Sequence, residues 1–271
     1  MYALYEARYE KEPSKNTSRN HHCALNSFFT YLERLDHVKS NPLRKLDPPK
    51  GERKANDYLS PEEDERLICA PVTPRERIII AWLRYTGMRA DVEATKVKQR
   101  DVDLTPTADY PWGRIIVKNS KTPRGRRVIP IFPELRVEID RWYEFLRKLE
   151  LRDLDLPVLV TAKRTPMTHD YLWRIVKRVA HRAEVRVTRC ACGTEKPARH
   201  EKGCPRSTNG KNLSEVTPHS LRRTFGSALR QEGKSIDSIS KALGHSDSRT
   251  TEQHYVDLED ATVAREILST A

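Results

Sequence analysis

Apolar positions in the first 60 residues predict one helix followed by a polar stretch. Within residues 20–40, four apolar residues at offsets of 0, 3, 4 and 7 share one side of a helix: Leu25, Phe28, Phe29 and Leu32. We expect the helix to end at Asn41-Pro42, because proline breaks a helix. Residues 43–57 are polar, basic and interrupted by prolines, so they are the best candidate for a linker.

A second region begins near residue 58 with two helix-start signals. Ser60-Pro61-Glu62-Glu63 combines an N-cap residue, a proline in the first turn and a glutamate three residues after the cap. Thr73-Pro74-Arg75-Glu76 repeats that signal and begins an apolar helix that reaches Tyr85. We expect this helix to stop at Gly87, a residue that suits the left-handed end of a helix.

The middle of the chain predicts a small sheet. Residues 113–119 and 126–132 are rich in β-branched side chains, and the turn between them contains proline and glycine, which is typical of a hairpin. Residues 102–104 are a candidate third strand. From Pro133 onward the pattern is helical again, apart from a break between Val187 and Val216. The predicted fold is therefore α+β and mainly helical, with a three-stranded sheet and a short helical N-terminal region.

Charge adds a candidate partner. The chain has 271 residues with 50 lysines and arginines against 38 acidic residues, a net charge of +12. Most of the excess lies between Val160 and Lys234, which hold 17 basic and 6 acidic residues. A concentrated basic region suits the phosphates of a nucleic acid. A solvated basic face that favours solubility explains the same numbers, so charge alone leaves both interpretations open.

Other totals exclude several classes of protein. No apolar run approaches the roughly 18 residues of a membrane span, and the acidic start from Met1 to Lys15 does not resemble a secretory signal. The five cysteines are an odd number, which argues against a disulfide framework and for a reducing compartment. We therefore expect a cytoplasmic protein that is not associated with a membrane; the resemblance described below adds that it is associated with DNA.

The C-terminal third carries the candidate chemistry. Thr217-Pro218 is expected to cap a helix that runs to about Gly233, with His219 and Arg222 three residues apart at its positively polarised start. Ser235 caps a shorter helix that ends at Leu243-Gly244, and His245 and Tyr255 follow. Each residue taken singly has an ordinary explanation as a surface side chain, a loop histidine or a core aromatic.

Together these pieces resemble the tyrosine recombinase (phage integrase) family. The second box of that family is matched by His219-Ser-Leu-Arg222, Leu243-Gly244-His245-Ser246 and Thr250-Thr251 with Tyr255. The first box is matched by Thr86-Gly87-Met88-Arg89, Glu93 and Asp101-Val102-Asp103-Leu104. Lys121, just before Arg126-Arg127-Val128-Ile129-Pro130, occupies the place of the catalytic lysine. The resemblance covers residues 58–265 and extends in part to the N-terminal helix.

Two spacings depart from the commonest pattern of the family. The acidic residue usually lies three positions after the first arginine, whereas Glu93 lies four after Arg89. The nucleophile usually lies nine positions after the histidine, whereas Tyr255 lies ten after His245. The first departure leaves open whether Glu93 or Asp91 supports Arg89.

The resemblance implies a role for each side chain. Tyr255 is the nucleophile that forms a phosphotyrosyl ester with DNA, and Arg89 and Arg222 stabilise the charge of the transition state. Lys121 is the general acid for the leaving hydroxyl. His219 is the base or hydrogen-bond partner of the phenol, and His245 binds a phosphate oxygen. No cofactor is implied for catalysis. Ordinary explanations are a salt bridge to Asp91 or Glu93 for Arg89 and a hairpin lysine for Lys121.

A second candidate site lies in the break at about residues 188–215. The spacing Cys-x-Cys-x7-His-x3-Cys supplies three thiolates and an imidazole that suit tetrahedral zinc: Cys190, Cys192, His200 and Cys204. We expect a structural zinc knuckle inserted before the helix that carries His219. The alternative is a surface loop with free thiols.

The resemblance also implies how the chain is organised. Residues 1–42 correspond to a partial or minimal helical DNA-binding region, 43–57 to the basic linker and 58–271 to the catalytic domain. The expected activity is site-specific recombination of double-stranded DNA of a mobile element or chromosome, by a homotetramer on two sites. Two alternatives stay open: a DNA-binding regulator derived from an integrase that no longer cleaves, and a type IB topoisomerase.

Overall fold

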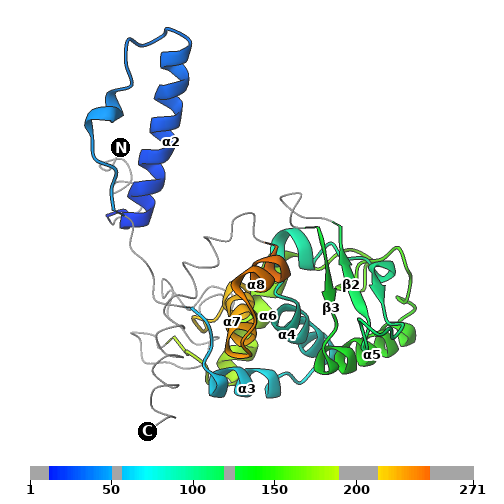
Figure 1. Ribbon diagram of the computed structural model, residues 1–271. Coiled ribbons are helices and arrows are strands. Elements are labelled where there is room, and N and C mark those ends of the chain that lie inside the picture. Colours follow the sequence, from blue (N-terminus) through cyan, green and yellow to red (C-terminus); the bar gives the residue numbers. More distant parts are fainter. Residues whose placement is uncertain (1–11, 51–56, 119–125, 189–212, 245–271) are drawn as a thin grey trace. The chain divides into compact units, whose positions relative to one another are not determined.

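The protein is described by a computed structural model that covers residues 12–50, 57–118, 126–188 and 213–244 (Figure 1). The chain divides into two compact units, Met1–Asn56 and Asp57–Ala271. In the described parts, no helix is both long and apolar enough to cross a membrane.

The N-terminal unit contains one long helix, α2 (Lys15–Arg34), and a short 3-10 turn, η1 (Pro42–Lys45). The predicted bounds of 20–40 are wrong at both ends. The helix begins earlier because the Ser14 hydroxyl accepts a hydrogen bond from the Thr17 N–H and caps it. It ends earlier because Asp36 adopts a left-handed conformation, with φ of 58°.

Asn41 joins the two elements of this unit. Its side-chain nitrogen donates to the Asn26 side chain at 2.8 Å and to the Thr30 hydroxyl at 3.0 Å, both on α2, and its oxygen accepts the Leu43 N–H. The predicted apolar stripe of α2 is only partly covered in the described part of the unit, where Leu25, Phe29 and Leu32 are half-buried. The helix buries no side chain, and Phe28 is 54% exposed.

The second unit is organised around a helix whose residues 78–84 are buried on every side. Helix α4 (Pro74–Thr86) buries Ile78, Ile79, Trp82 and Leu83 completely, because α3 (Pro61–Cys69), α5 (Pro133–Lys148), α6 (His169–Arg182) and α7 (Pro218–Gln231) surround it (Figure 1). The predicted caps are confirmed. Ser60 and Glu63 form a capping box, and Thr73 accepts the Glu76 N–H.

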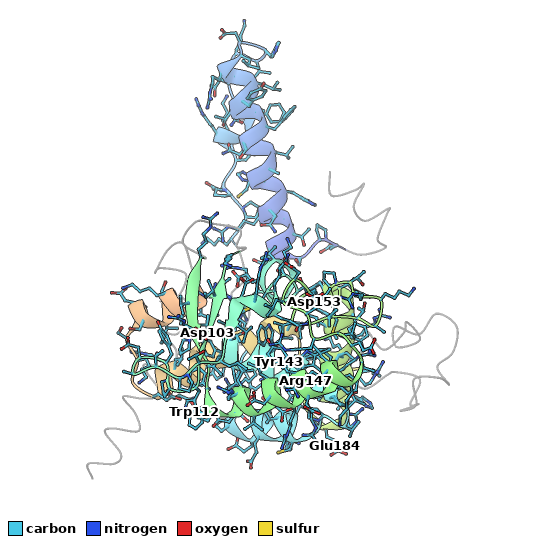
Figure 2. The ribbon with its side chains drawn as sticks, turned by 90° about the vertical axis from the view of Figure 1, so that its right-hand side faces the viewer. Asp103, Trp112, Tyr143, Arg147, Asp153 and Glu184 are labelled. Carbon is cyan, nitrogen blue, oxygen red and sulfur yellow. The ribbon has the colours of Figure 1, made fainter. Side chains whose placement is uncertain are left out.

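The predicted hairpin and third strand are also confirmed. Strands β1 (Val102–Asp103), β2 (Arg114–Val117) and β3 (Arg127–Pro130) form an antiparallel sheet in that order. In its register Ile115 pairs with Ile129, and both are buried. Figure 2 shows Asp103 and Trp112 at the side of the unit formed by this sheet. The sheet therefore fixes the two ends of the 119–125 turn, which lies outside the described residues.

Helix α5 packs beside the sheet. Leu135, Ile139, Trp142 and Leu146 repeat at helical spacing and are fully buried. Tyr143 and Arg147, one turn apart, are labelled in Figure 2; Tyr143 is buried and Arg147 is exposed.

The prediction that the chain is helical from Pro133 to Val187 is wrong after α5, because residues 149–168 are irregular. Val158–Val160 are buried there, and isolated bridges pair Pro157 with Lys98 and Val160 with Pro166. The predicted break after Val187 is present, and its two ends meet: Val187 and Ser214 form a bridge, and Thr188 N–H donates to Leu213. Helices α7 and α8 (Ile236–Leu243) follow as predicted.

Candidate active site

The first arginine of the candidate site follows the turn that ends α4. Gly87 closes the helix with a left-handed φ of 58°. The Thr86 hydroxyl donates back to the Trp82 carbonyl and accepts the Met88 N–H, which fixes the turn. Met88 is buried, so the next residue, Arg89, leaves the core at a defined point.

Glu93, rather than Asp91, holds Arg89. The Arg89 guanidinium donates to Glu93 Oε1 at 2.8 Å, and the Arg89 backbone N–H donates to Glu93 Oε2 at 2.9 Å. Glu93 is fully buried, whereas Asp91 is exposed. Residues Ala90–Ala94 form a π turn, in which the Ala94 N–H reaches the Arg89 carbonyl five residues back. A π turn accommodates one additional residue, so the unusual spacing still brings the carboxylate to the arginine.

The second arginine, Arg222, lies on α7, and its side chain is only 4% exposed. Thr217 caps the start of this helix as the sequence predicted, and Ser220 completes a capping box that was not predicted. The guanidinium donates to the Gly87 carbonyl and, at 2.7 Å, to the Leu243 carbonyl. Its Nη1 lies 3.9 Å from Glu93 Oε2. Arg222 and Arg89, 133 positions apart in the sequence, therefore meet at one carboxylate.

His219 lies in the first turn of α7, three residues before Arg222. It is exposed where Arg222 is buried, so the two side chains differ in their access to solvent. The imidazole, at the positively polarised start of the helix, is therefore the group of this pair that an anion in solvent reaches first.

A third arginine at the site was missed by the sequence analysis. Arg127, the first residue of β3, donates from Nη2 to Glu93 Oε2 at 3.2 Å and from Nε to the Ala242 carbonyl at 2.6 Å. Its side chain is 7% exposed. The available signal was its position in the Arg126–Pro130 run, but a charged residue at the start of a strand ordinarily faces solvent.

These arginines determine the ionisation of Glu93. Burial raises the pKa of the Glu93 carboxyl. That pKa is lowered by a larger amount by the charge and hydrogen bond of Arg127, by the Arg89 N–H and by the charge of Arg222, so the net shift is downward. The carboxylate therefore stays charged and keeps three guanidinium groups in place around it.

Several predicted residues lie outside the described part of the chain. They are Lys121, His245 and Tyr255 of the catalytic set and Cys190, Cys192, His200 and Cys204 of the zinc site. Of the predicted residues that the structure does describe, Arg89, Glu93 and Arg222 come together, and His219 lies on the helix of Arg222. The described residues include no cluster of His, Cys, Asp and Glu side chains suited to a metal ion.

A family comparison accounts for this arrangement. The model of the Phage integrase family matches residues 57–262, well over half of the chain. The chain belongs to the phage integrase family. This integrase-family chain is thus a tyrosine recombinase, an enzyme that cuts and rejoins DNA strands.

The curated proteins that this chain resembles are named as tyrosine recombinases. It is 25% identical over 235 residues to "Tyrosine recombinase XerD" of Neisseria meningitidis serogroup B, covering 84% of this chain and 68% of the relative. It is 29% identical over 235 residues to "Tyrosine recombinase XerA" of Thermococcus kodakarensis, covering 84% and 66%. Its fold resembles XerH recombinase bound to a palindromic difH substrate in a post-cleavage complex. The TM-score is 0.67 at 21% identity, over 98% of this chain and 70% of that one.

Proposed function

We propose that this integrase-family chain is a site-specific recombinase that breaks and reseals double-stranded DNA through a 3′-phosphotyrosyl bond to Tyr255. The convergence of Arg89 and Arg222 on buried Glu93 carries the proposal. Two guanidinium groups held this way form a preorganised, positively charged site, which stabilises the charge that develops on phosphate oxygens in a phosphoryl transfer.

The proposed reaction needs no external energy. The Tyr255 oxygen attacks the phosphorus and loses its proton, with His219 as the accepting or hydrogen-bonding group. The bond from phosphorus to the 5′ oxygen breaks, and that oxygen leaves as a hydroxyl after receiving a proton from Lys121. His245 donates a hydrogen bond to a phosphate oxygen. Attack by a 5′ hydroxyl of another strand then reverses the step and releases Tyr255.

The proposed assignment extends to the rest of the chain. Residues 58–271 form the catalytic domain, 43–57 the linker and 1–42 a short helical DNA-binding region. Its partner is double-stranded DNA, on which four copies assemble across two sites. Catalysis requires no cofactor, and Cys190, Cys192, His200 and Cys204 hold a structural zinc ion in the segment before α7.

A covalent-capture experiment tests the central proposal. The chain is incubated with a nicked suicide duplex that carries the repeated sequence flanking its gene, and the products are separated under denaturing conditions. We expect a protein–DNA adduct that Tyr255→Phe abolishes. Tyr171→Phe, a matched change of a half-buried tyrosine on α6, should leave the adduct unchanged.

The suicide duplex, together with a pair of intact duplexes that permit religation, separates the alternatives. Binding to the flanking repeat with no adduct would support a regulator that no longer cleaves. Cleavage and religation by a monomer, with no exchange between two duplexes, would support a topoisomerase. Either result would refute site-specific recombination as the activity.

A further inference from the structure

We propose that Arg127 is a positioning residue for DNA cleavage, which aligns the Arg89–Glu93–Arg222 cluster with the end of α8 and with the base of the β2–β3 hairpin. This inference rests on the proposed recombinase activity. It adds a residue that acts through its neighbours, because the Arg127 guanidinium donates to the Glu93 carboxylate and to the Ala242 carbonyl.

The first support is the double contact of the Arg127 guanidinium. Nη2 lies 3.2 Å from Glu93 Oε2, the oxygen that also accepts the Arg89 backbone N–H and lies 3.9 Å from Arg222. Nε donates to the Ala242 carbonyl on α8 at 2.6 Å. One planar group therefore joins the sheet, the π turn and α8, and a forked geometry of this kind is specific to arginine.

The second support is the order of contacts at the end of α8. Three consecutive carbonyls accept hydrogen bonds from three different arginines: Arg127 to Ala242, Arg222 to Leu243 and Arg89 to Gly244. Cations are favoured at the C-terminal end of a helix, where unpaired carbonyls concentrate negative charge. The last of these carbonyls belongs to the residue just before His245, so the three arginines define where the segment carrying His245 leaves α8.

The three arginines differ in how bound DNA would change their hydrogen bonds. Arg89 is 28% exposed and donates to the Gly244 carbonyl at a long 3.2 Å, so a phosphate competes directly for that donor. Arg222 is expected to turn part of its donor set to the same phosphate. Arg127 lies outside the two motifs that supply Arg89 and Arg222. In this proposal it keeps its contacts with Glu93 and the Ala242 carbonyl, and so it preserves the position of α8 and Glu93 when the other two arginines engage DNA.

Arg127 also lies six residues after Lys121, at the point where the chain returns to the sheet. Its contact with Glu93 therefore links the base of the hairpin, which carries Lys121, to the carboxylate that holds Arg89 and Arg222. Loss of the contact between Arg127 and Glu93 should misplace reacting groups without removing any of them. Such misplacement lowers the rate of cleavage by up to about 100-fold.

The test compares Arg127→Gln, Arg127→Lys and Arg84→Gln with the wild-type chain. Arg84 on α4 forms a similarly buried ion pair at 2.7 Å with Asp64 on α3. Because this pair does not include Glu93, Arg84→Gln controls for the general loss of a buried ion pair. The rate of adduct formation on the suicide duplex is measured in single turnover at saturating protein, well below each melting temperature, from pH 5 to pH 8. DNA affinity is measured in parallel by fluorescence anisotropy.

We expect Arg127→Gln to cleave on the order of 10- to 100-fold more slowly with DNA affinity changed less than about threefold. As the pH is lowered, its rate should begin to fall at a higher pH than the wild-type rate does. The reason is that Glu93 then faces only Arg89 and Arg222 and becomes easier to protonate. Arg127→Lys should restore the wild-type pH profile and part of the rate, since lysine supplies the charge without the fork. Arg84→Gln should be less stable but cleave at the wild-type rate.

Other outcomes are distinct from these. A wild-type chain that forms no adduct refutes the proposed recombinase activity and this inference with it. Wild-type cleavage with an unchanged rate and pH profile in Arg127→Gln refutes the inference alone. Equal losses of rate in Arg127→Gln and Arg84→Gln, with no shift of the pH profile, would show that Arg127 contributes only to stability.

Discussion

Gly87 offers a direct test of how the first arginine is positioned. Its φ of 58° lies in the left-handed region, and a Cβ atom added there would lie 2.4 Å from Cδ1 of Phe225 and 3.0 Å from Leu243. Phe225 is 4% exposed and packs edge-on against Phe132, with ring centroids 6.2 Å apart, so its ring cannot swing into solvent. Gly87→Ala should therefore cost both conformational strain and overpacking.

Gly233 separates the two costs. It is also left-handed, with φ of 77°, but nothing lies within 4 Å of an added Cβ atom. Gly233→Ala should lower the free energy of unfolding by about 1–2 kcal/mol, the cost of the left-handed conformation. Gly87→Ala should lose that amount and about 1–3 kcal/mol more from overpacking, for a total of roughly 2–5 kcal/mol. The reduced entropy of the unfolded chain offsets both variants equally and cancels in the comparison.

Urea denaturation followed by tryptophan fluorescence measures the difference. All four tryptophans belong to the unit that begins at Asp57, so the signal reports on that unit alone. Gly87→Ala should also slow adduct formation, because the Gly87 carbonyl accepts from Arg222 and would move with the turn. Equal losses of stability in the two variants would refute the close contact with Phe225 as the reason for glycine at this position.

Two further predictions concern acid and metal. The pKa values of Glu63, Glu76 and Glu93 are all lowered from 4.5, because facing arginines outweigh burial, so the stability they contribute should be intact above pH 4.5 and lost as the pH falls below it; thermal melting between pH 3 and pH 7 checks this, and a flat melting temperature would contradict it. Metal analysis of the purified chain should find about one zinc ion, which Cys190→Ser and Cys204→Ser abolish and which Cys23→Ser and Cys69→Ser, at exposed free thiols, retain. Zinc-free wild-type protein would rule out the knuckle.

Local signals in the sequence were sufficient for much of the fold. Ser60, Thr73 and Thr217 cap helices because the hydrogen bonds of a cap are made within a few residues, and these residues show the pattern directly. Gly87 ends α4 for the same local reason. The family motifs then brought Arg89 and Arg222 to one site, a contact across 133 positions that periodicity alone does not reveal.

The features that were missed had two causes: local signals outside the apolar pattern, and tertiary contacts. The bounds of α2 were wrong because Ser14, outside the apolar stripe, supplied the cap, and Asp36 supplied the stop. The choice between Asp91 and Glu93 depended on the π turn, which the spacing of residues in the sequence does not reveal. Arg127 looked like a surface residue of a strand, and only its approach to Glu93 and the Ala242 carbonyl identifies it as part of the site.

Under the proposed mechanism, the charges at the site give a reason for a buried carboxylate among three arginines. Arg89, Arg127 and Arg222 bring three positive charges and Glu93 one negative charge, which leaves this cluster with a net charge of two. A phosphodiester carries one negative charge, and attack by a phenolate adds a second in the transition state. If the proposed mechanism holds, the cluster matches the transition state more closely than it matches bound DNA, which is the condition for faster chemistry rather than tighter binding. Without Arg127 the net charge would fall to one and match the ground state instead, so its loss should act on the rate of cleavage more than on affinity.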